Sequence, residues 1–317
     1  MSVEPQVAVV IPSWNSAALL PACIASIRAQ GIEVETMVVD NGSADGSVAF
    51  LEREGIAHVT LPRNVGFAAA VNLGVAHTTA TAVLVLNVDT VLEPRSIERL
   101  AAKLAADPGL GGVQPCLLQL EGEPGDAASA RLYSAGMALT ADGRAVETGA
   151  GEVRSEAWSR GREVFGVCGA ACLLRRELFT ELGGYDESYV SFYEDVELNV
   201  RGRIAGWRFA YEPEAVVWHV GNASWQVGFT RPGAENARLV ARNRIATQAK
   251  FMPASALPRI AAVEAGALVR AARQRRLRPT LHGKLEGLAR LPKSLRERRR
   301  LAATGDLGRA RAWLGRI

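Results

Sequence analysis

The sequence lacks the features that would place the chain in a membrane or outside the cell. None of its apolar runs reaches the roughly eighteen residues that a membrane-spanning helix needs. Residues 1–6 carry no basic stretch followed by an apolar one, so no secretory leader is visible. Four cysteines among 317 residues are too few for a disulfide scaffold, and we expect them to be buried thiols. These absences predict a cytoplasmic protein.

Several motifs that define large enzyme classes are also missing. No G-x-G-x-x-G follows a predicted strand, and there is no Walker loop, G-x-S-x-G elbow or H-E-x-x-H helix. Dehydrogenases, kinases, α/β-hydrolases and zinc proteases depend on those motifs. Cys168 and Cys172 have no second cysteine pair and no nearby histidine, which favours buried thiols over a zinc site.

Acidic residues are scarce at the C-terminal end. The net charge is only +4, yet residues 251–317 hold 16 Lys and Arg against 4 Asp and Glu, whereas residues 1–250 hold 21 against 29. The composition there shifts to Ala, Leu and Arg, which predicts amphipathic helices over 259–277 and 281–301. We therefore expect a main domain over 1–250 and a basic helical extension over 251–317.

This basic extension has two open interpretations, membrane contact and packing against protein, and a third, nucleic-acid binding, that is disfavoured. It would be attracted to anionic lipid headgroups, which predicts peripheral contact with the inner face of the cell membrane. Alternatively, its helices pack on the main domain or in a homo-oligomer. Nucleic-acid binding is disfavoured because Trp313 is the only aromatic residue after Phe251, so stacking platforms are missing. We expect no nucleic-acid partner.

Within residues 1–250, short apolar strands alternate with helices. Strands are predicted at 7–11, 34–39, 57–61, 82–86, 110–120, 164–174, 207–211 and 215–218, and helices at 17–30, 43–54, 68–77, 94–106, 194–205 and 234–251. Strand-helix alternation with short loops predicts an α/β fold, in which helices flank a mostly parallel sheet. Pro115 predicts that its strand is an edge strand or bulged.

One segment, residues 121–162, breaks this alternation. It is rich in Gly, Ala and polar residues and has several turn signals. We expect an irregular excursion that bears a hairpin. Such excursions in α/β enzymes often carry substrate-specific loops, and the alternative is a surface insertion without a role.

Carboxylates follow two of the apolar strands. Asp40 comes directly after strand 34–39, and Asp89 follows strand 82–86 by three residues. Ligands of open α/β sheets collect in the crevice beyond the strand ends. A carboxylate there would hold a divalent cation together with substrate phosphates. The alternative is that Asp89 caps the next helix or forms a turn.

A second acidic group opens the predicted helix 194–205. Glu194, Asp195 and Glu197 lie in its first turn, where the helix dipole favours ionised carboxylates. We therefore expect a lowered pKa for Asp195, which would act as a general base on an attacking hydroxyl. The alternative is an ordinary acidic first turn.

Five segments in this order resemble the family 2 glycosyltransferases of GT-A fold, and most closely their bacterial rhamnosyltransferase-like branch. The resemblance covers about residues 5–250. It is carried by V-I-P-S-W-N at 10–15, V-D-N-G-S-A-D-G-S at 39–47, N-V-G-F-A-A-A-V-N at 64–72, L-N-V-D at 86–89 and Y-E-D at 193–195. It implies a GT-A, Rossmann-like mostly parallel sheet.

The resemblance implies roles for the residues that match the family motifs. Asp195 matches the catalytic base, and Asp89 matches the last carboxylate of a metal-binding D-x-D whose first position is the neutral Asn87. His219 falls where many such enzymes place a histidine on the metal or pyrophosphate, although a histidine without such a role is an alternative. The implied cofactor is Mg²⁺ or Mn²⁺.

Substrate-binding roles follow in the same way. Those implied to contact the nucleotide-sugar donor are Pro12, Trp14, Asp40, Asn41, Gly42, Asn64, Gly66 and Phe67, with Asn87 and Glu194 beside the metal and the base. Arg242 would contact the leaving pyrophosphate. The alternative is that Arg242 is a solvated arginine on a helix without a role in binding.

The implied activity is an inverting, metal-dependent sugar transfer in cell-envelope glycan synthesis. The expected donor is dTDP-rhamnose, and the expected acceptor is a polysaccharide or lipid-linked glycan. The alternatives are another donor carrying a galactofuranosyl, glucosyl or N-acetylhexosaminyl unit, or a non-catalytic scaffold that binds nucleotide sugars. A sugar-nucleotide pyrophosphorylase is disfavoured because no Gly-rich, Arg-containing loop follows the first strand.

Overall fold

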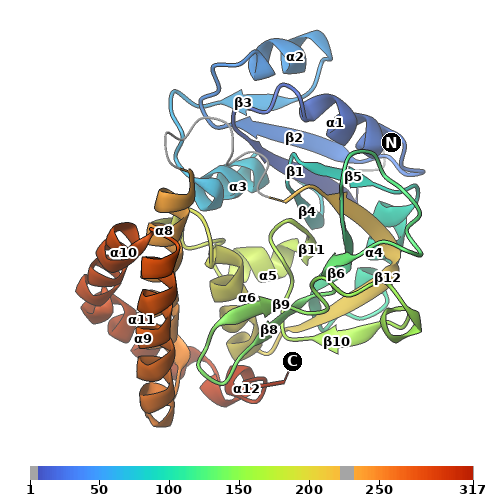
Figure 1. Ribbon diagram of the computed structural model, residues 1–317. Coiled ribbons are helices and arrows are strands. Elements are labelled where there is room, and N and C mark those ends of the chain that lie inside the picture. The colour runs from blue at the N-terminus through green and yellow to red at the C-terminus, as the bar shows by residue number, and fades with distance from the viewer. Residues whose placement is uncertain (1–5, 222–231, 317) are drawn as a thin grey trace.

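The computed structural model describes residues 6–221 and 232–316 and confirms the α/β architecture (Figure 1). A ten-stranded sheet has the order β10-β12-β6-β11-β4-β1-β2-β3, with β5 paired to β12 and β7 to β6. Its strands are β1 Val7–Ser13, β2 Glu35–Asp40, β3 His58–Thr60, β4 Ala82–Leu86, β5 Thr90–Leu92, β6 Leu110–Gln119, β7 Leu132–Ser134, β10 Arg162–Val164, β11 Ala171–Arg175 and β12 Arg208–His219.

Helices cover the sheet and continue past it to the C-terminal end. They are α1 Leu20–Arg28, α2 Ser47–Arg53, α3 Phe67–Ala76, α4 Ser96–Ala105, α5 Arg176–Glu181, α6 Glu194–Ala205, α8 Pro232–Phe251, α9 Leu257–Arg273, α10 Leu277–Ala289, α11 Leu291–Thr304 and α12 Leu307–Arg311. The predicted segment 281–301 is therefore parts of two helices, because the chain turns at Arg290.

The first half of the sheet is parallel, and its strand β4 is buried on both faces. β4 pairs with β1, β1 with β2, and β2 with β3, all in parallel. Along β4, Leu84 and Leu86 pack into one hydrophobic core while Val83 and Val85 pack into the other. This alternation is why the strand reads as an unbroken apolar run. The carboxyl ends of these strands meet at one edge of the sheet.

Some strand predictions need correction. The predicted strands 207–211 and 215–218 are one strand, β12. β6 is an interior strand between β12 and β11, so the edge alternative for Pro115 is wrong; the bulge alternative agrees with the register shift between Glu212 and Val216 of β12, opposite Pro115. The predicted strand 164–174 is two strands, β10 and β11. The residues between them include Gly169, whose backbone turns toward α6 and bonds a side chain there.

The excursion bears the expected hairpin. Strands β8 Met137–Leu139 and β9 Ala145–Glu147 pair antiparallel in a small separate sheet. The backbone N–H of Met137 donates to the carbonyl oxygen of Gly166 at 2.9 Å, which fixes the hairpin beside the turn between β10 and β11.

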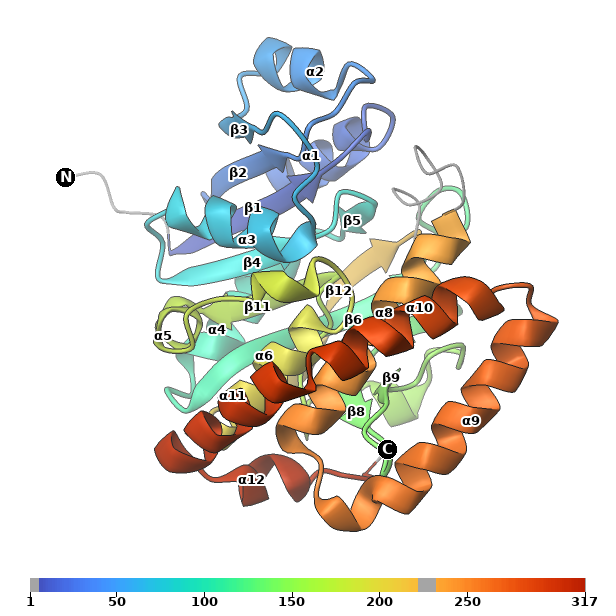
Figure 2. The ribbon, with the colours of Figure 1, turned by 90° about the vertical axis from the view of Figure 1, so that its left-hand side faces the viewer.

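The C-terminal helices pack on the main domain. Figure 2 shows α10 and α11 running along α8, with α9 set at an angle to them. At the contact with α8, Gly283 and Gly287 of α10 lie so close to backbone carbonyls of α8 that an added Cβ would overlap them. The backbone N–H of Asp306 donates to the carbonyl oxygen of Ile204 at the end of α6. The division at residue 250 stays a prediction.

Candidate active site

Asp89 and His219 are brought together by strand pairing. β5 begins directly after Asp89 and pairs antiparallel with the end of β12, so that Thr90 lies opposite His219. The Asp89 Oδ1 atom lies 3.2 Å from His219 Nε2, and both side chains are 2% exposed. Asn87 Nδ2 lies 3.4 Å from the same nitrogen. The three predicted polar side chains therefore meet in one corner.

This corner fits a cation that a substrate helps to hold. No group of three or more His, Cys, Asp or Glu side chains within 6–221 and 232–316 is arranged to hold a metal ion. Asp89 and His219 supply a carboxylate and an imidazole, and Asn87 supplies an amide. Mg²⁺ and Mn²⁺ keep several non-protein oxygen ligands in such sites, commonly from substrate phosphates. The donor set therefore suits a cation that arrives with a diphosphate.

A cleft of about 270 Å³ joins this corner to the start of α6. Its lining includes six of the predicted site residues: Phe67, Asn87, Asp89, Glu194, Asp195 and His219. The two carboxylates to which we assigned separate roles, Asp89 and Asp195, thus face one shared space although they are far apart in the sequence.

Asp195 accepts two backbone hydrogen bonds at the base of the cleft. Gly169 N–H donates to its Oδ2 at 2.9 Å, and Val196 N–H donates to its Oδ1 at 2.7 Å. Burial nevertheless raises the pKa of Asp195 above its usual value, and these bonds only reduce the rise. The expected lowering by the helix dipole is therefore wrong. A raised pKa gives the carboxylate a greater proton affinity, which suits a general base.

Glu194 differs sharply from its neighbour. Its side chain is 6% exposed, and its Oε2 has no hydrogen-bond partner among the described residues. Burial, followed by the charge of Asp195, raises the pKa of Glu194 well above its usual value. The uncharged form is thus favoured, which leaves Asp195 as the base of this pair.

The loop before α6 has an unusual backbone. Val190, Phe192 and Tyr193 all have positive φ, at 66°, 67° and 70°. Such conformations cost about 1–3 kcal/mol each for residues other than glycine, so the surroundings must impose them. Because Asp195 follows this loop directly, whatever holds the loop also places the carboxylate.

Side chains of helix α8 hold this loop in place by donating hydrogen bonds to the carbonyl oxygens of the loop. Asn243, which is fully buried, donates from Nδ2 to the carbonyls of Tyr189, Ser191 and Phe192 at 2.7–2.9 Å. Arg242 donates from Nη2 to the carbonyls of Ser188 and Tyr189 at 3.1 and 2.7 Å. Arg242 is buried and is absent from the residues lining the cleft, so its position gives no support to the predicted pyrophosphate contact.

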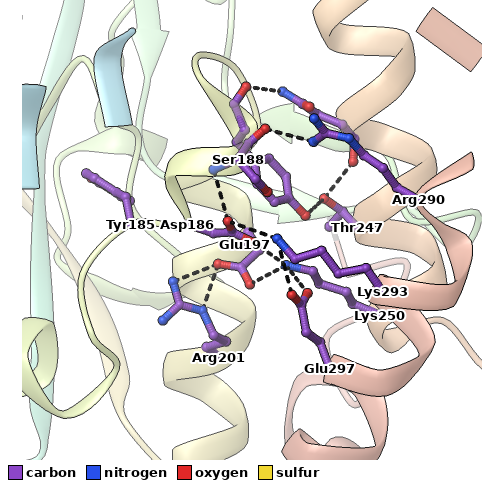
Figure 3. Close-up of polar contacts among 12 residues, drawn as sticks. Tyr185, Asp186, Ser188, Glu197, Arg201, Thr247, Lys250, Arg290, Lys293 and Glu297 are labelled. Carbon is purple, nitrogen blue, oxygen red and sulfur yellow. Dashed lines mark hydrogen bonds and ion pairs between the residues drawn. The ribbon is translucent and has the colours of Figure 1, made fainter. Parts of the chain in front are cut away.

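An ion cluster extends this support to the C-terminal helices (Figure 3). Lys250 of α8 lies 2.8 Å from Asp186, 3.0 Å from Glu197 of α6 and 2.9 Å from Glu297 of α11. Glu197 also pairs with Arg201 at 2.7 Å, as the i,i+4 spacing indicates.

The same cluster shifts the pKa values of its acids. Burial is the largest single influence and would raise the pKa of Asp186 and Glu197. The charge of Lys250 and the hydrogen bonds from Lys250 and Ser188 together lower the pKa of Asp186, and the charges and hydrogen bonds of Arg201 and Lys250 together lower that of Glu197. The first turn of α6 is therefore anchored to α8 and α11 by ionised side chains.

The predicted nucleotide residues gather at the ends of β1 and β2. Asp40 is fully buried; its Oδ2 accepts from Ser43 N–H at 3.0 Å, and its Oδ1 has no hydrogen-bond partner in the described part of the chain. A buried acceptor without a donor suits the N–H edge of a base. Gly42 has φ +78°, and an added Cβ would lie 2.7 Å from the Arg63 backbone, so only glycine fits. Pro12 lies near the end of β1, and Trp14 directly follows that strand.

The donor segment is tied directly to the loop before α6. Asn41 accepts from Val65 N–H at 2.8 Å and donates to the Gly66 carbonyl at 3.2 Å, while Asn64 accepts from Gly66 N–H at 2.9 Å. An added Cβ on Gly66 would lie 2.6 Å from the Val190 carbonyl oxygen. The predicted nucleotide-binding segment therefore packs directly against the loop that leads to the predicted base, Asp195.

That contact continues into α3. The N–H of Phe67 donates to Ser191 Oγ at 3.3 Å, and the N–H of Ala68 donates to the Val190 carbonyl at 3.1 Å. Backbone N–H groups in the first turn of α3, which have no partner within the helix, thus donate to the loop that precedes α6.

Sequence reasoning missed the four cleft residues of the excursion, Tyr133, Met137, Ala145 and Glu147, of which Glu147 and Tyr133 are polar. Glu147 of β9 accepts from Ser134 Oγ at 2.5 Å, and burial raises the pKa of Glu147 to about 7, with a smaller upward contribution from the charge of Asp195. The ring of Tyr133 packs edge-on against His219, with centroids 4.4 Å apart. No local signal marks either residue, because only the folding of 121–162 over the cleft places them there. Residues 222–225, predicted as part of a polar loop, lie outside the described residues.

Comparison with known proteins decides the family. The sequence profile described as "Glycosyl transferase family 2" matches residues 8–183, more than half of the chain. The chain belongs to that family. The match includes Asp40 at the end of β2 and Asp89 between β4 and β5. The expected family and fold are confirmed.

Individual relatives are more distant. An N-acetylglucosaminyl-diphospho-decaprenol L-rhamnosyltransferase of Mycobacterium tuberculosis is 29% identical over 203 residues, which is 59% of this glycosyltransferase and 66% of the relative. The chain thus matches just under two thirds of that relative's length. The uncharacterized protein y4gI of Sinorhizobium fredii is 28% identical over 71% of the chain but only 25% of that protein.

Solved structures support the fold. The mannosyltransferase PcManGT from Pyrobaculum calidifontis, in complex with GDP-Man and Mn²⁺, aligns with 98% of this chain and 79% of its own at TM-score 0.50 and 20% identity. GalNAc-T7 with UDP, GalNAc and Mn²⁺ aligns with 79% of this chain and 49% of its own at TM-score 0.60 and 14% identity.

Proposed function

We propose that this glycosyltransferase transfers rhamnose from dTDP-rhamnose, with inversion, to a lipid-linked or polysaccharide acceptor in cell-envelope glycan synthesis. The observation that carries the proposal is the shared cleft, with Asp89 and His219 in one corner and Asp195 at its base. The named relative, whose acceptor is a decaprenyl diphosphate sugar, supports the choice of sugar and acceptor. A cytoplasmic enzyme at the inner membrane face would meet such an acceptor.

In this proposal the residues divide into three groups. Asp89 and His219, with Asn87, would hold Mg²⁺ or Mn²⁺ together with the donor diphosphate, and a cation bound there would neutralise the negative charge of the leaving diphosphate. Asp195 removes the proton from the acceptor hydroxyl. The residues that bind the nucleotide are Pro12, Trp14, Asp40, Asn41, Gly42, Asn64, Gly66 and Phe67.

A single displacement needs one base and no enzyme nucleophile. The described lining of the cleft offers Asp195 as a carboxyl group with a raised pKa, and burial raises the pKa of Glu194 beside it well above its usual value. Cys168 also lines the cleft, but burial raises the pKa of its thiol, so the nucleophilic thiolate is disfavoured. This arrangement supports inversion.

The donor is tested by a panel of nucleoside diphosphate sugars in the presence of Mn²⁺. We expect dTDP-rhamnose to raise the melting temperature, and UDP- and GDP-sugars to raise it less, because a ligand that binds only the folded state stabilises it. Radiolabelled rhamnose should then appear on an N-acetylglucosaminyl-diphospho-polyprenol acceptor.

Two results would count against the proposal. A larger shift with a UDP-hexose or UDP-galactofuranose would replace the donor and leave the reaction class intact. Binding of dTDP-rhamnose without transfer to any lipid-linked or glycan acceptor would favour a nucleotide-sugar-binding scaffold.

A further inference from the structure

The C-terminal helices carry an unusual apolar surface. Leu281, Leu285 and Leu288 of α10 are 40%, 64% and 50% exposed, and Leu295 of α11 is 45% exposed. Their spacing of three, four and seven residues aligns them along one side of nearly continuous helices. Beside this stripe lies a groove of about 570 Å³ between α8, α9, α10 and α11, and its apolar lining includes Leu257, Ile260, Leu288, Leu291 and Leu295.

Helix α10 is oriented with its small residues inward. Thr280, Gly283 and Gly287 are buried against α8, where glycine permits the close approach of the two backbones. A helix on the surface of a globular protein normally turns its leucines inward and its small or polar residues outward. Here the leucines are outside although the helix is tightly packed, so the exposed stripe is not a packing defect of α10.

Basic side chains surround the start of this stripe. Arg273, Arg275, Arg276 and Arg278 are all exposed, and they flank the exposed Leu277 at the turn between α9 and α10. The whole extension, 251–317, has 16 basic against 4 acidic residues. This excess repels a second copy of the same surface but is complementary to a layer of anionic headgroups.

We propose that α9, α10 and the start of α11 form a docking surface for an anionic lipid bilayer, with the leucine stripe in the acyl-headgroup boundary and the arginines on the phosphates. This surface deepens the proposed function, because it would place the cleft beside a lipid-linked acceptor. Membrane contact here requires no spanning segment, and among the described residues no helix is long and apolar enough to cross a bilayer.

The test is flotation of the full chain with vesicles of phosphatidylcholine, alone or with about one third phosphatidylglycerol. We expect wild-type protein to float only with the anionic vesicles. Leu281→Gln/Leu285→Gln should lower the partition coefficient about tenfold or more. Arg275→Gln/Arg278→Gln should lower it as well and should flatten its dependence on salt.

The control variants separate this surface from general effects. Val153→Gln replaces an apolar residue of similar exposure, 47%, on the excursion and should float as wild type does. Circular dichroism should show nearly unchanged melting for the leucine pair, because both side chains are largely exposed and fill no core position. Asp195→Asn should float normally while its sugar transfer falls by about 10²–10⁴-fold, so loss of flotation and loss of activity are distinguishable.

The proposal is overturned if wild-type protein does not float with anionic vesicles, or if the leucine pair floats as wild type does. If the leucine pair instead converts a dimer to a monomer on gel filtration and leaves flotation unchanged, the surface binds a second copy of the chain.

Discussion

Replacing Asp195 by Asn is expected to lower kcat for sugar transfer by about 10²–10⁴-fold, the usual contribution of a positioned general base. The amide cannot take up the acceptor proton, whereas its oxygen can still accept the Gly169 N–H. Because burial raises the pKa of Asp195, its ionised form destabilises the folded state at neutral pH. Removing that charge offsets the weakened hydrogen bonding, so the melting temperature should hardly change.

Glu194→Gln is the matched control for this result. The two residues are adjacent, and both changes replace a carboxylate by its amide. Because burial raises the pKa of Glu194 and so favours its uncharged form, we expect the activity of the Glu194→Gln variant to fall less than about tenfold. Equal losses from Asp195→Asn and Glu194→Gln would contradict the assignment of the base.

The second large effect is expected from Lys250→Met. This change removes the cation that Asp186 shares with Glu197, which is 3% exposed. Removing one partner of a buried ion pair costs about 3–5 kcal/mol, and because Arg201 still pairs with Glu197 we expect a loss at the lower end of that range. Urea unfolding at pH 7 measures this loss of free energy of unfolding. Activity should fall too, because α6 and the loop before Asp195 lose their anchor on α8.

The pH dependence of this effect has a definite sign. Lowered pKa values mean that Asp186 and Glu197 contribute stability above their ordinary pKa of about 4, and that this contribution disappears as the pH falls through their folded values. The difference between wild type and Lys250→Met should therefore shrink below about pH 4.

Lys293→Met is the control for the lysine. It removes the same charge, but Lys293 is half exposed and lies 3.9 Å from Asp186 and 3.6 Å from Glu297. Exposed pairs contribute about 0–1 kcal/mol, so its unfolding should resemble wild type. A similar loss in both variants would show that net charge, and not the buried cluster, is responsible.

The sequence predicts much of the fold because its signals are local. β4 is an apolar run that polar residues bound. The i,i+4 spacing of Glu197 and Arg201 indicates the helix α6, in which the two side chains pair. The carboxylates after parallel strands can also be placed, since those strands end at the same edge. These rules predicted that Asp40 and Asp89 lie at or just beyond the carboxyl ends of parallel strands, and the structure places them there.

The supporting interactions could not be predicted because their partners are distant in the sequence. Lys250 meets Glu197 53 residues away, and Asn243 bonds three carbonyls of the loop before α6. Neither contact leaves a pattern in either segment alone. Burial, which depends on the whole fold, likewise outweighed the helix dipole at Asp195, and the exposed leucines of α10 contradict the usual inward orientation.

Calorimetric titration of dTDP in the presence of Mn²⁺ into wild type, Asp195→Asn and Asp89→Asn tests most directly whether two carboxylates with different roles share the cleft. We expect Asp195→Asn to bind dTDP as tightly as wild type while remaining inactive, and Asp89→Asn to bind at least about tenfold more weakly. Equal affinity for all three proteins, or weak binding by Asp195→Asn with Asp89→Asn unaffected, would contradict the separation of metal and base between these two side chains.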